Sequence, residues 1–542
     1  MKIEKLLSDV EILSYHNFDQ TTKNLNISQV CDNSCDKNIK NSLFVCINGL
    51  NFDSHNEISE LENKGVRFFV CEKEIETKCP FVVVKSSRKS LPKICDNFYN
   101  HPTKSFALIG VVGTNGKTST SHFVCDFLHF LGKRCSVIGT SGVFVNRKRF
   151  DCSLTTPDPI ELYKIFDRIR KNKNNFAIME VSAHAIKLEK VNNLIFDALI
   201  FTNFSQDHLD FFASMDEYKK TKFSIFNKFN AKKAFINFDD DAGKELFDKI
   251  KNEIPTFTFG KTQQCDFSFL PQKATIFGTN FILTMKKEYV KFFDIKNLKS
   301  NFSCDDNLWI GVREGESFCC TNFFSRVPCE FNLYNIVGAM LCAVNVLDCT
   351  RGKLEKQEIS KIKFCNGVKK NEEKLITKKM VENLRLVKGR FDLIETLNEK
   401  NILIDFAHTP ESLKLLLENV KNLCNLKIVA LLGCPGNRDE TKREIMGKIC
   451  YDYCEKVYIT SDNPCYENPL IIANEIKKGT KEKGEVIENR KKAIKKAIKN
   501  LKKDEILCII GKGSENFQDI NGEKYEYSDY IEVEKCIKKL KK

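Results

Sequence analysis

A short segment combines glycine, lysine and threonine in a spacing that can hold phosphate groups. It runs Gly113-Thr-Asn-Gly-Lys-Thr-Ser119, after the apolar stretch Ser105–Ile109 and before a helical pattern. A glycine turn between a strand and a helix lets backbone N–H groups and the helix N-terminus face an anion. Lys117 adds a charge for the outer phosphates, and the Thr118 hydroxyl is placed to bind Mg²⁺. The segment therefore predicts an ATP site built from Gly113, Thr114, Asn115, Gly116, Lys117, Thr118 and Ser119.

Three polar residues further along the chain could complete a magnesium site. Glu180 ends an apolar strand pattern, His208 follows another such pattern, and Lys222 lies in a lysine-rich segment. Mg²⁺ binds one or two carboxylates together with phosphate oxygens and water, so Glu180 near the glycine turn suffices for one ion. A neutral His208 could complete a second site, whereas a lysine with a pKa of about 10.4 would repel both ions. Taken alone, His208 is more often a core or capping histidine, and Lys222 would be a charge on a helix surface.

These residues need a parallel sheet to bring them together. Strand patterns alternate with helical stretches, which favours α/β architecture with helices on both faces of parallel sheets. We expect three domains, covering residues 1–104, 105–387 and 388–542, with a β-rich excursion over 265–328 and a linker or insertion over 366–388. The expected strands are 42–47, 66–70, 81–84, 135–138, 176–179, 198–201, 402–404, 428–432, 457–459 and 506–510.

In the third domain the strand patterns end in polar loops. The loops begin at Asp405, Gly433, Thr460 and Gly511. Because ligands bind at the carboxyl ends of strands in open α/β sheets, these loops predict a second wall of an active site.

Composition excludes several classes of protein. The 542 residues include 42% hydrophobic and 29% charged residues, and no apolar run is long enough for a signal peptide or a membrane span. We therefore expect a cytoplasmic enzyme. The 24 cysteines are scattered and contain no Cys-x-x-Cys pair, so we expect neither disulfides nor a structural metal.

The net charge of +14 is carried largely by lysine-rich patches, of which 489–503 is the clearest. Its apolar residues recur at helical spacing, which predicts a helix with one packed face and lysines in water. Interleaved aromatic residues or a nucleic-acid-reading motif are missing from this segment, so we expect no nucleic-acid partner.

Several motifs, taken together and in order, resemble those of the Mur ligases, most closely the MurE branch, the UDP-N-acetylmuramoyl-tripeptide synthetases. The resemblance spans nearly the full chain. It implies a UDP-binding N-terminal domain, a central ATPase domain and a Rossmann-like C-terminal domain that brings the amino acid. The motifs are Gly113-Thr-Asn-Gly-Lys-Thr-Ser, Thr155-Thr-Pro-Asp-Pro, Met179-Glu-Val-Ser-Ala-His, Phe201-Thr-Asn-Phe-Ser-Gln-Asp-His, Phe331-Asn-Leu-Tyr-Asn, Asp405-Phe-Ala-His-Thr-Pro and Ser461-Asp-Asn-Pro.

Members of this family phosphorylate the terminal carboxylate of a UDP-MurNAc-peptide with ATP, and the amine of an amino acid then displaces phosphate. The resemblance implies that Lys117, Glu180, His208 and Lys222 are catalytic and that Thr118, Glu180, His208 and Lys222 surround magnesium. Lys222 would be carbamylated (N6-carboxylysine), which turns a cation into an oxygen ligand. Asn335, Arg390 and Asp405 match residues around the nucleotide, and Thr155, Thr156, Ser182 and Lys190 match residues that hold the UDP-MurNAc-dipeptide.

The amino-acid site departs from the family pattern. Diaminopimelate-adding members read Asp-Asn-Pro-Arg, and that arginine holds the side-chain carboxylate, but this chain has Cys465 there. Glu515 remains to contact a distal amine and Arg438 to hold the α-carboxylate. We therefore predict lysine or ornithine as the free diamino acid, with meso-diaminopimelate as the alternative. The amino-acid-binding residues implied are Arg438, Asp462, Asn463, Cys465, Gly511 and Glu515.

Two other functions stay open at this point. One is a related ligase such as folylpolyglutamate synthetase, against which the Thr155 and Ser461 motifs argue. The other is a non-catalytic structural homologue, against which the presence of Lys117, Glu180, His208 and Lys222 argues. The expected protein is thus a monomeric ligase of peptidoglycan precursor synthesis that uses ATP and Mg²⁺. We also note that the family's usual Gly-Arg is Cys329-Glu330 here.

Overall fold

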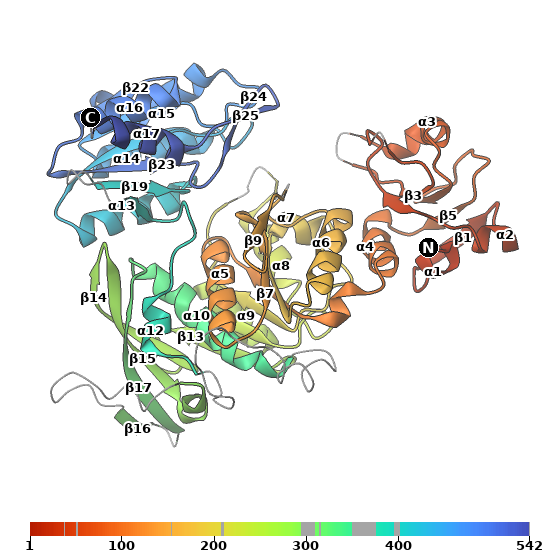
Figure 1. The fold of residues 1–542 in the computed structure, drawn as a ribbon, viewed down its shortest axis with the longest axis horizontal. Coiled ribbons are helices and arrows are strands. Elements are labelled where there is room, and N and C mark those ends of the chain that lie inside the picture. Colours follow the sequence, from red (N-terminus) through yellow and green to blue (C-terminus); the bar gives the residue numbers. More distant parts are fainter. Residues whose placement is uncertain are drawn as a thin grey trace.

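The computed structural model describes residues 1–36, 38–49, 52–152, 154–207, 211–293, 309–313, 316–349, 375–394 and 401–540. Within these residues, three main sheets lie in three successive units of the chain, as Figure 1 shows. Each sheet is rich in parallel strands and carries helices, so the predicted α/β architecture is confirmed. The expected domain boundaries near residues 104 and 387 fall between these sheets and stay predictions.

The N-terminal unit contains a five-stranded sheet in the order β1-β5-β4-β3-β2. Strands β2 to β5 are parallel, and β1 closes one edge antiparallel to β5. Short apolar runs that are buried on both faces form the inner strands, as expected for parallel sheets. The elements are α1 (Ile3–Leu6), β1 (Ile12–His16), α2 (Gln20–Lys23), β2 (Gln29–Cys31), β3 (Ser42–Val45), η1 (Ser54–Glu57), α3 (Ile58–Asn63), β4 (Phe68–Cys71), β5 (Phe81–Val84) and α4 (Ser87–Phe98).

The central unit contains a 12-stranded sheet in the order β16-β17-β15-β14-β13-β12-β11-β6-β10-β7-β8-β9. Within this order, the strands β14, β13, β12, β11, β6, β10 and β7 are each parallel to the next. At one edge of the sheet, β8 and β9 pair antiparallel after β7. The elements up to β13 are η2 (Pro102–Ser105), β6 (Ala107–Val112), α5 (Lys117–Phe130), β7 (Cys135–Gly139), β8 (Gly142–Val145), β9 (Lys148–Phe150), α6 (Pro159–Lys171), β10 (Phe176–Val181), α7 (Ala183–Lys187), β11 (Ala198–Phe201), α8 (Met215–Phe223), β12 (Ala234–Asn237), α9 (Asp241–Ile250) and β13 (Thr256–Gly260).

An antiparallel extension continues this sheet, which confirms the β-rich excursion for the residues that the structure describes. Strands β14, β15, β17 and β16 pair in that order, and helix α10 then returns to pack on α5. The elements are β14 (Phe267–Thr275), β15 (Gly278–Lys286), η3 (Lys287–Phe292), β16 (Trp309–Arg313), β17 (Glu316–Ser325), α10 (Phe331–Asn345), η5 (Leu347–Cys349) and α12 (Lys378–Glu382). Of the expected linker over 366–388, residues 366–374 lie outside the described residues, whereas the rest contains α12 and buries Ile376, Val381 and Leu384 in the central core, so the linker prediction is wrong for that part.

The C-terminal unit contains a six-stranded sheet in the order β18-β19-β23-β20-β21-β22, parallel except for β18. A separate hairpin, β24–β25, follows the last parallel strand. The elements are β18 (Asp392–Ile394), β19 (Asn401–Asp405), α13 (Pro410–Leu423), β20 (Lys427–Leu432), α14 (Thr441–Tyr453), β21 (Lys456–Ile459), α15 (Pro469–Thr480), η6 (Lys481–Lys483), β22 (Gly484–Val486), α16 (Arg490–Asn500), β23 (Glu505–Ile510), β24 (Phe517–Ile520), β25 (Glu523–Glu526) and α17 (Asp529–Leu540).

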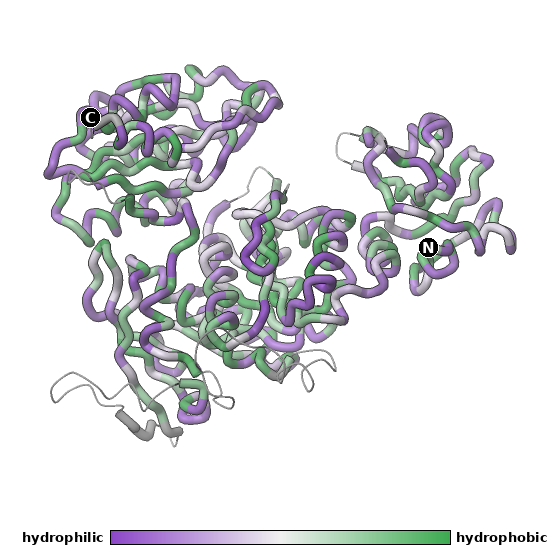
Figure 2. Tube along the Cα trace, in the orientation of Figure 1, coloured by the Kyte–Doolittle hydropathy of each residue, from purple (hydrophilic) through white to green (hydrophobic). Residues whose placement is uncertain are grey.

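Helices cover both faces of the C-terminal sheet. One core lies against α13, α14 and α15, and the other lies against α16 and α17. Figure 2 shows hydrophobic residues concentrated on the strands and hydrophilic residues on the surrounding helices. In α16 the apolar residues Ala493, Ile494, Ala497 and Ile498 are buried while its lysines are exposed, which confirms the predicted solvated face. In the described part of the chain, no helix combines the length and apolar character that a bilayer crossing requires.

Candidate active site

Two glycines shape the turn between β6 and α5. Gly116 precedes the first helical residue with φ +81, and a Cβ there would lie 2.4 Å from Asn335 Oδ1. A Cβ on Gly113 would lie 1.9 Å from Thr202 Oγ1. Both positions therefore require glycine, because a larger residue would push the turn away from its neighbours. The turn leaves the backbone free to approach an anion, as the sequence predicts.

Replacing Gly116 by alanine is expected to weaken ATP binding by about tenfold or more. The substitution strains a left-handed backbone by about 1–2 kcal/mol and forces Asn335 to move, so the turn loses its shape. Isothermal titration with ATP would measure the loss. Alanine at Gly132, which also has positive φ (+79) but ends α5 away from the turn, is the matched control. Equal losses for the two variants would contradict the role of the turn.

The turn is held from the next strand by a polar pair that sequence analysis missed. Thr202 Oγ1 donates to the Asn115 carbonyl at 2.7 Å, and Asn203 Nδ2 donates to the same oxygen at 3.1 Å. Asn203 Oδ1 in turn accepts from the Asn115 backbone N–H at 2.8 Å. These residues follow β11, which is the parallel neighbour of β6. The shape of the turn is therefore preset before any ligand arrives.

Lys117 lies inside the turn. Its Nζ donates to the carbonyls of Gly113 at 2.9 Å and Thr114 at 2.8 Å. Burial lowers the pKa of Lys117, while the nearby carboxylates of Glu180 and Asp207 oppose that effect. Thr118 and Ser119 are buried in the first turn of α5. The ATP-site residues predicted from Gly113 to Ser119 are thus brought together at one helix N-terminus.

Lys222 of α8 is the most unusual residue of the site. Its side chain is 1% exposed, and its Nζ donates to Thr114 Oγ1 of the turn at 2.8 Å. The amine also lies 4.1 Å from the centre of the Tyr218 ring. Burial, followed by the positive charge of Lys117, lowers the pKa of Lys222 well below its ordinary value. The surface-charge interpretation of Lys222 is therefore excluded, and burial favours the neutral form of its amine.

Glu180 lies at the carboxyl end of β10 and is 1% exposed. Its carboxylate accepts from the Thr140 backbone N–H at 3.0 Å and from the Thr140 hydroxyl at 3.1 Å. Thr140 Oγ1 lies 3.0 Å from Thr155 Oγ1. Thr156 donates to the Glu180 carbonyl at 2.9 Å and accepts from the Ser182 N–H at 3.0 Å. The predicted carboxylate thus sits beside the three hydroxyl residues predicted to hold the larger substrate.

Lys190 and His208 are two further residues that the sequence predicts for this site. Lys190 forms an ion pair with Asp158 at 2.7 Å, so it belongs to the same motif region as Thr155. His208 lies outside the described residues, and its role stays a prediction.

The C-terminal unit reaches this region through a short series of contacts. Arg390 lies within electrostatic range of Lys117, and its guanidinium stacks 4.6 Å from the Phe406 ring centre. Phe406 packs against Gly513, where an added Cβ would lie 2.7 Å from Phe406 Cβ. His408, which sequence analysis did not single out, lies within electrostatic range of Asp207. Phe406 therefore packs between Arg390 and the loop that contains Gly511 and Glu515, and the charge of Arg390 acts on Lys117.

Asp405 and Asn335 are two further residues that the sequence predicts around the nucleotide. Asp405 accepts from the backbone N–H groups of Phe391 at 2.6 Å and Ala407 at 2.7 Å. Burial raises its pKa, and Arg390 opposes that effect. Asn335 Oδ1 accepts from Thr120 Oγ1 of α5 at 3.1 Å. Asp405 retains further acceptor positions for a hydroxyl group, because a carboxylate offers about four lone-pair sites.

The C-terminal loops meet around a lysine that sequence analysis missed. Lys512 is fully buried, and its Nζ donates to Asn463 Oδ1 at 2.7 Å and to Glu515 Oε2 at 2.9 Å. Asn463 also donates to Glu515 Oε2 at 3.0 Å. Asp462 lies 3.6 Å from the lysine amine and 2.6 Å from where a Gly511 Cβ would be. The structure thus brings Asp462, Asn463, Gly511 and Glu515 together in one polar cluster, and their role in binding an amino acid stays a prediction.

Arg438 and Cys465 lie on adjoining loops of this cluster. Asn437 Oδ1 accepts from the Tyr466 N–H at 3.0 Å, and the Gly436 N–H donates to the Asn463 carbonyl at 2.8 Å. Burial raises the pKa of Cys465, while Arg438 lies close enough to lower it. The loop that lacks an arginine at position 465 therefore still has a guanidinium as neighbour.

The structure shows the backbone and the partners of Cys329 and Glu330, which stand where the family usually has Gly-Arg. Cys329 is fully buried and has φ +71, a conformation that favours glycine, which is the family's usual residue there. Glu330 pairs with Lys261.

The donors around the turn fit magnesium only in part. Glu180 and the Thr118 hydroxyl are oxygen donors of the kind that Mg²⁺ prefers. The amine of Lys222 does not fit a magnesium ion, but a carboxylate added to that amine would.

Comparisons with known proteins agree with this arrangement. The Mur ligase middle domain matches residues 111–343, and the Mur ligase, glutamate ligase domain matches residues 389–513. A UDP-N-acetylmuramoyl-L-alanyl-D-glutamate–2,6-diaminopimelate ligase of Clostridioides difficile is 32% identical over 100% of both chains. A solved structure of a ligase with that name covers 100% of this chain and 99% of its own, with a TM-score of 0.62 and 22% identity. The MurF ligase of Thermotoga maritima, solved with ADP, covers 95% and 96%, with a TM-score of 0.52 and 16% identity.

Proposed function

The chain belongs to the Mur ligase family, and on that basis we propose that it joins diaminopimelate to UDP-N-acetylmuramoyl-L-alanyl-D-glutamate, with conversion of ATP to ADP and phosphate. The full-length match to a ligase named for these substrates supports the proposal. The single structural observation that carries it is the buried amine of Lys222, 2.8 Å from Thr114 Oγ1 of the phosphate turn. A carboxylate added to this amine would supply oxygen ligands for Mg²⁺ beside the phosphate turn.

Lys222 is suited to carbamylation. A neutral amine attacks CO₂, forms an N–C bond and releases one proton, which leaves a carbamate anion on the lysine. Burial and the charge of Lys117 lower the pKa of Lys222, so the neutral amine that this reaction needs is available. The product would place two carboxylate oxygens near Thr114 and Asp207. We propose that these oxygens, Glu180, Thr118 and His208 surround Mg²⁺.

The first chemical step would activate the terminal carboxylate of the UDP-MurNAc-dipeptide. One carboxylate oxygen attacks the γ-phosphorus of ATP, the bond to ADP breaks, and an acyl phosphate forms. When bound, Mg²⁺ neutralises charge on the transferring phosphoryl group. Lys117 and the N–H groups at the start of α5 would hold the phosphates, and Asn335, Arg390 and Asp405 the rest of the nucleotide. Thr155, Thr156, Ser182 and Lys190 would hold the acceptor, and the N-terminal unit its UDP group.

The second step forms the amide. The free amine of the amino acid attacks the acyl carbon, inorganic phosphate leaves with the C–O bond electrons, and the nitrogen loses a proton. The cluster of Asp462, Asn463, Gly511 and Glu515 would orient the amine substrate, with Lys512 fixing Asn463 and Glu515. Positioning is the main contribution here, because holding the deprotonated amine against the acyl carbon turns a bimolecular step into an effectively unimolecular one.

The relatives support diaminopimelate better than the predicted lysine or ornithine, because they are named for diaminopimelate. The prediction rested on Cys465, which provides no cationic fork for a carboxylate. The structure places Arg438 within electrostatic range of Cys465, so a single motif position does not report all the charges at the site. Folylpolyglutamate synthetase is disfavoured by the same full-length relatives, as is a non-catalytic role.

Phosphate release from ATP tests the proposal. Purified protein is given the UDP-MurNAc-dipeptide with meso-diaminopimelate, lysine or ornithine, each in turn, and the product is identified by mass spectrometry. Release that requires the dipeptide and is fastest with diaminopimelate is expected. Faster turnover with lysine or ornithine would overturn the choice of amino acid, and no release with any of them would overturn the ligase assignment.

Replacing Arg438 by alanine is expected to lower kcat/KM for diaminopimelate by roughly 10- to 150-fold, because a charge-assisted hydrogen bond contributes about 1.5–3 kcal/mol. The KM for ATP should stay within about twofold. Alanine at exposed Lys448, on α14 after the same loop, is the control for general loss of positive charge. An unchanged KM for the amino acid would show that Arg438 does not contact it.

A further inference from the structure

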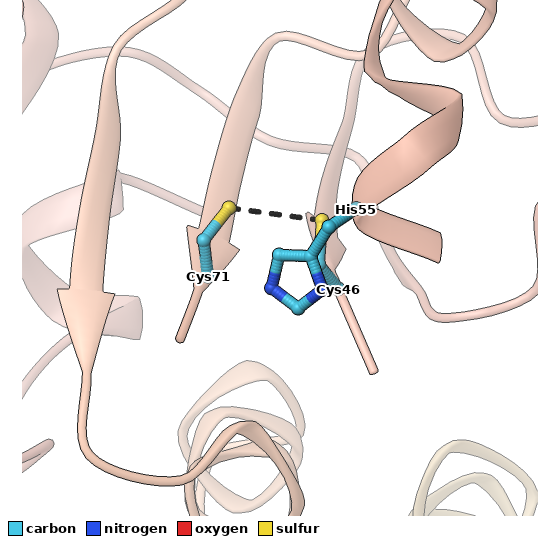
Figure 3. Close-up of side chains that lie close together, drawn as sticks. All are labelled: Cys46, His55 and Cys71. Carbon is cyan, nitrogen blue, oxygen red and sulfur yellow. Dashed lines mark hydrogen bonds between the residues drawn. The ribbon is translucent and has the colours of Figure 1, made fainter. Parts of the chain in front are cut away.

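Cys46, His55 and Cys71 form a buried group in the N-terminal unit, far from the phosphate turn in the chain (Figure 3). The two sulfurs and one ring nitrogen all lie within 4.8 Å of one another. The two cysteines are fully buried and His55 is 7% exposed. Cys46 directly follows β3 and Cys71 ends β4, its parallel neighbour, while His55 lies in η1. The three residues lack the Cys-x-x-Cys spacing that identifies a metal site in a sequence, so sequence analysis predicted no structural metal.

The hydrogen bonds of His55 fix its protonation. Nδ1 lies 2.5 Å from Asp53 Oδ1, and Nε2 lies 3.1 Å from the backbone N–H of Glu72. The amide can only donate, so Nε2 is an acceptor and the proton is on Nδ1. The Asp53 carboxylate is fixed in turn by Lys73 at 3.2 Å. A neutral imidazole whose Nδ1–H bonds a carboxylate is the arrangement typical of metal-binding histidines.

The sulfurs have the separation that a tetrahedral metal requires. Two thiolates bound at about 2.3 Å with a tetrahedral angle lie about 3.8 Å apart, and Cys71 Sγ lies 3.7 Å from Cys46 Sγ. A disulfide would instead need about 2.05 Å between them. We propose that Cys46, Cys71 and His55 bind a thiophilic divalent cation, with zinc as the expected ion and water as its fourth ligand. This site is independent of the proposed ligase reaction.

Binding would release two protons, one from each thiol, and would replace the Glu72–His55 hydrogen bond with a metal–nitrogen bond. Without the cation, Cys71 Sγ donates a hydrogen bond to Cys46 Sγ. The affinity should therefore increase with pH. The ion would tie the ends of β3 and β4 to η1, and so stabilise the loop edge of the N-terminal sheet.

Cobalt substitution tests the site in the full-length protein. The reduced, chelator-treated protein is titrated with Co²⁺ in excess Mg²⁺, which occupies sites made of oxygen ligands. We expect sulfur-to-cobalt charge-transfer absorption that saturates at one equivalent and is reversed by Zn²⁺. Cys46→Ser and Cys71→Ser should each remove most of this absorption. Asp53→Asn, which keeps all three ligands, should weaken the affinity by about 10- to 100-fold.

A second thiol–imidazole group provides the matched control. Cys125, His129 and Cys135 also lie within 4.8 Å of one another, but Cys125 and His129 are only half-buried. Cys125→Ser should leave the cobalt spectrum unchanged. Circular dichroism checks that each variant is folded. If a cysteine variant does not fold, the weaker cobalt affinity expected for Asp53→Asn tests the site instead. No charge-transfer absorption in the unaltered protein, or absorption that survives both Cys46→Ser and Cys71→Ser, would overturn the proposal.

Discussion

Replacing Lys222 by alanine is expected to lower kcat by about 10³-fold, which is the cost of removing one preorganised charge from an active site. The side chain is 1% exposed and its amine contacts Thr114 of the phosphate turn. If the amine carries a carbamate, the variant loses an anion and not a cation. Short carboxylic acids such as acetate or propionate should then enter the vacated space and restore part of the turnover. Rates of phosphate release at increasing acid concentration measure both effects.

Lys222→Arg separates the carbamate from the positive charge. Arginine keeps a cation there but cannot form a carbamate at neutral pH, so it should be as inactive as alanine. ATP affinity, measured by calorimetry, should decrease much less than kcat in both variants. Removal of CO₂ should slow the unaltered enzyme reversibly. Full activity of Lys222→Arg, or no rescue of Lys222→Ala by any acid, would remove the carbamate from the mechanism.

The phosphate turn was predictable because its residues are adjacent in the chain. The seven residues from Gly113 to Ser119 are consecutive and include Lys117. A strand, a turn and a helix are therefore enough to place them. The residues that hold the turn were not predictable in the same way. Thr202 and Asn203 act from a neighbouring strand, and only the strand order β11-β6-β10 brings them to Asn115. Order in a parallel sheet is a property of the whole fold, which local patterns do not contain.

The amino-acid site shows a second limit of sequence analysis. The prediction of lysine or ornithine used Cys465 and Glu515, with Arg438 assigned to the α-carboxylate. The folded loops bring the charge of Arg438 near Cys465 and add the fully buried Lys512, which contacts Glu515. Specificity depends on the sum of such charges, and the sum requires the pairing of loops that are distant in the chain. The group of Cys46, His55 and Cys71 also depends on which strands pair in the fold, so sequence analysis did not predict it.

Replacing Arg490 by methionine is expected to destabilise the C-terminal unit by about 3–5 kcal/mol, because it leaves a buried carboxylate without its partner. Arg490 binds Asp529 through Nε at 2.9 Å and Nη2 at 2.8 Å, and both side chains are 0% exposed. Tyr527 donates to the same carboxylate at 2.8 Å. Nη2 also donates to the Ile510 carbonyl at 3.1 Å, directly before the loop of Gly511 to Glu515. The variant should therefore also lose affinity for the amino acid.

Replacing both partners separates charge burial from packing. The double variant Arg490→Met, Asp529→Leu should recover much of the stability, because an apolar pair of similar volume needs no charge compensation. Burial opposes ionisation of Asp529, but Arg490 outweighs burial and lowers its pKa. The contribution of the pair should thus be complete above the ordinary pKa of 3.8 and disappear as the pH falls through the lowered value. Urea midpoints and hydrogen exchange in α16, α17 and β23 measure this, since a multidomain chain need not unfold in one step. A double variant as unstable as Arg490→Met would show that the packing of Arg490, and not the charge left on Asp529, sets the stability of this unit.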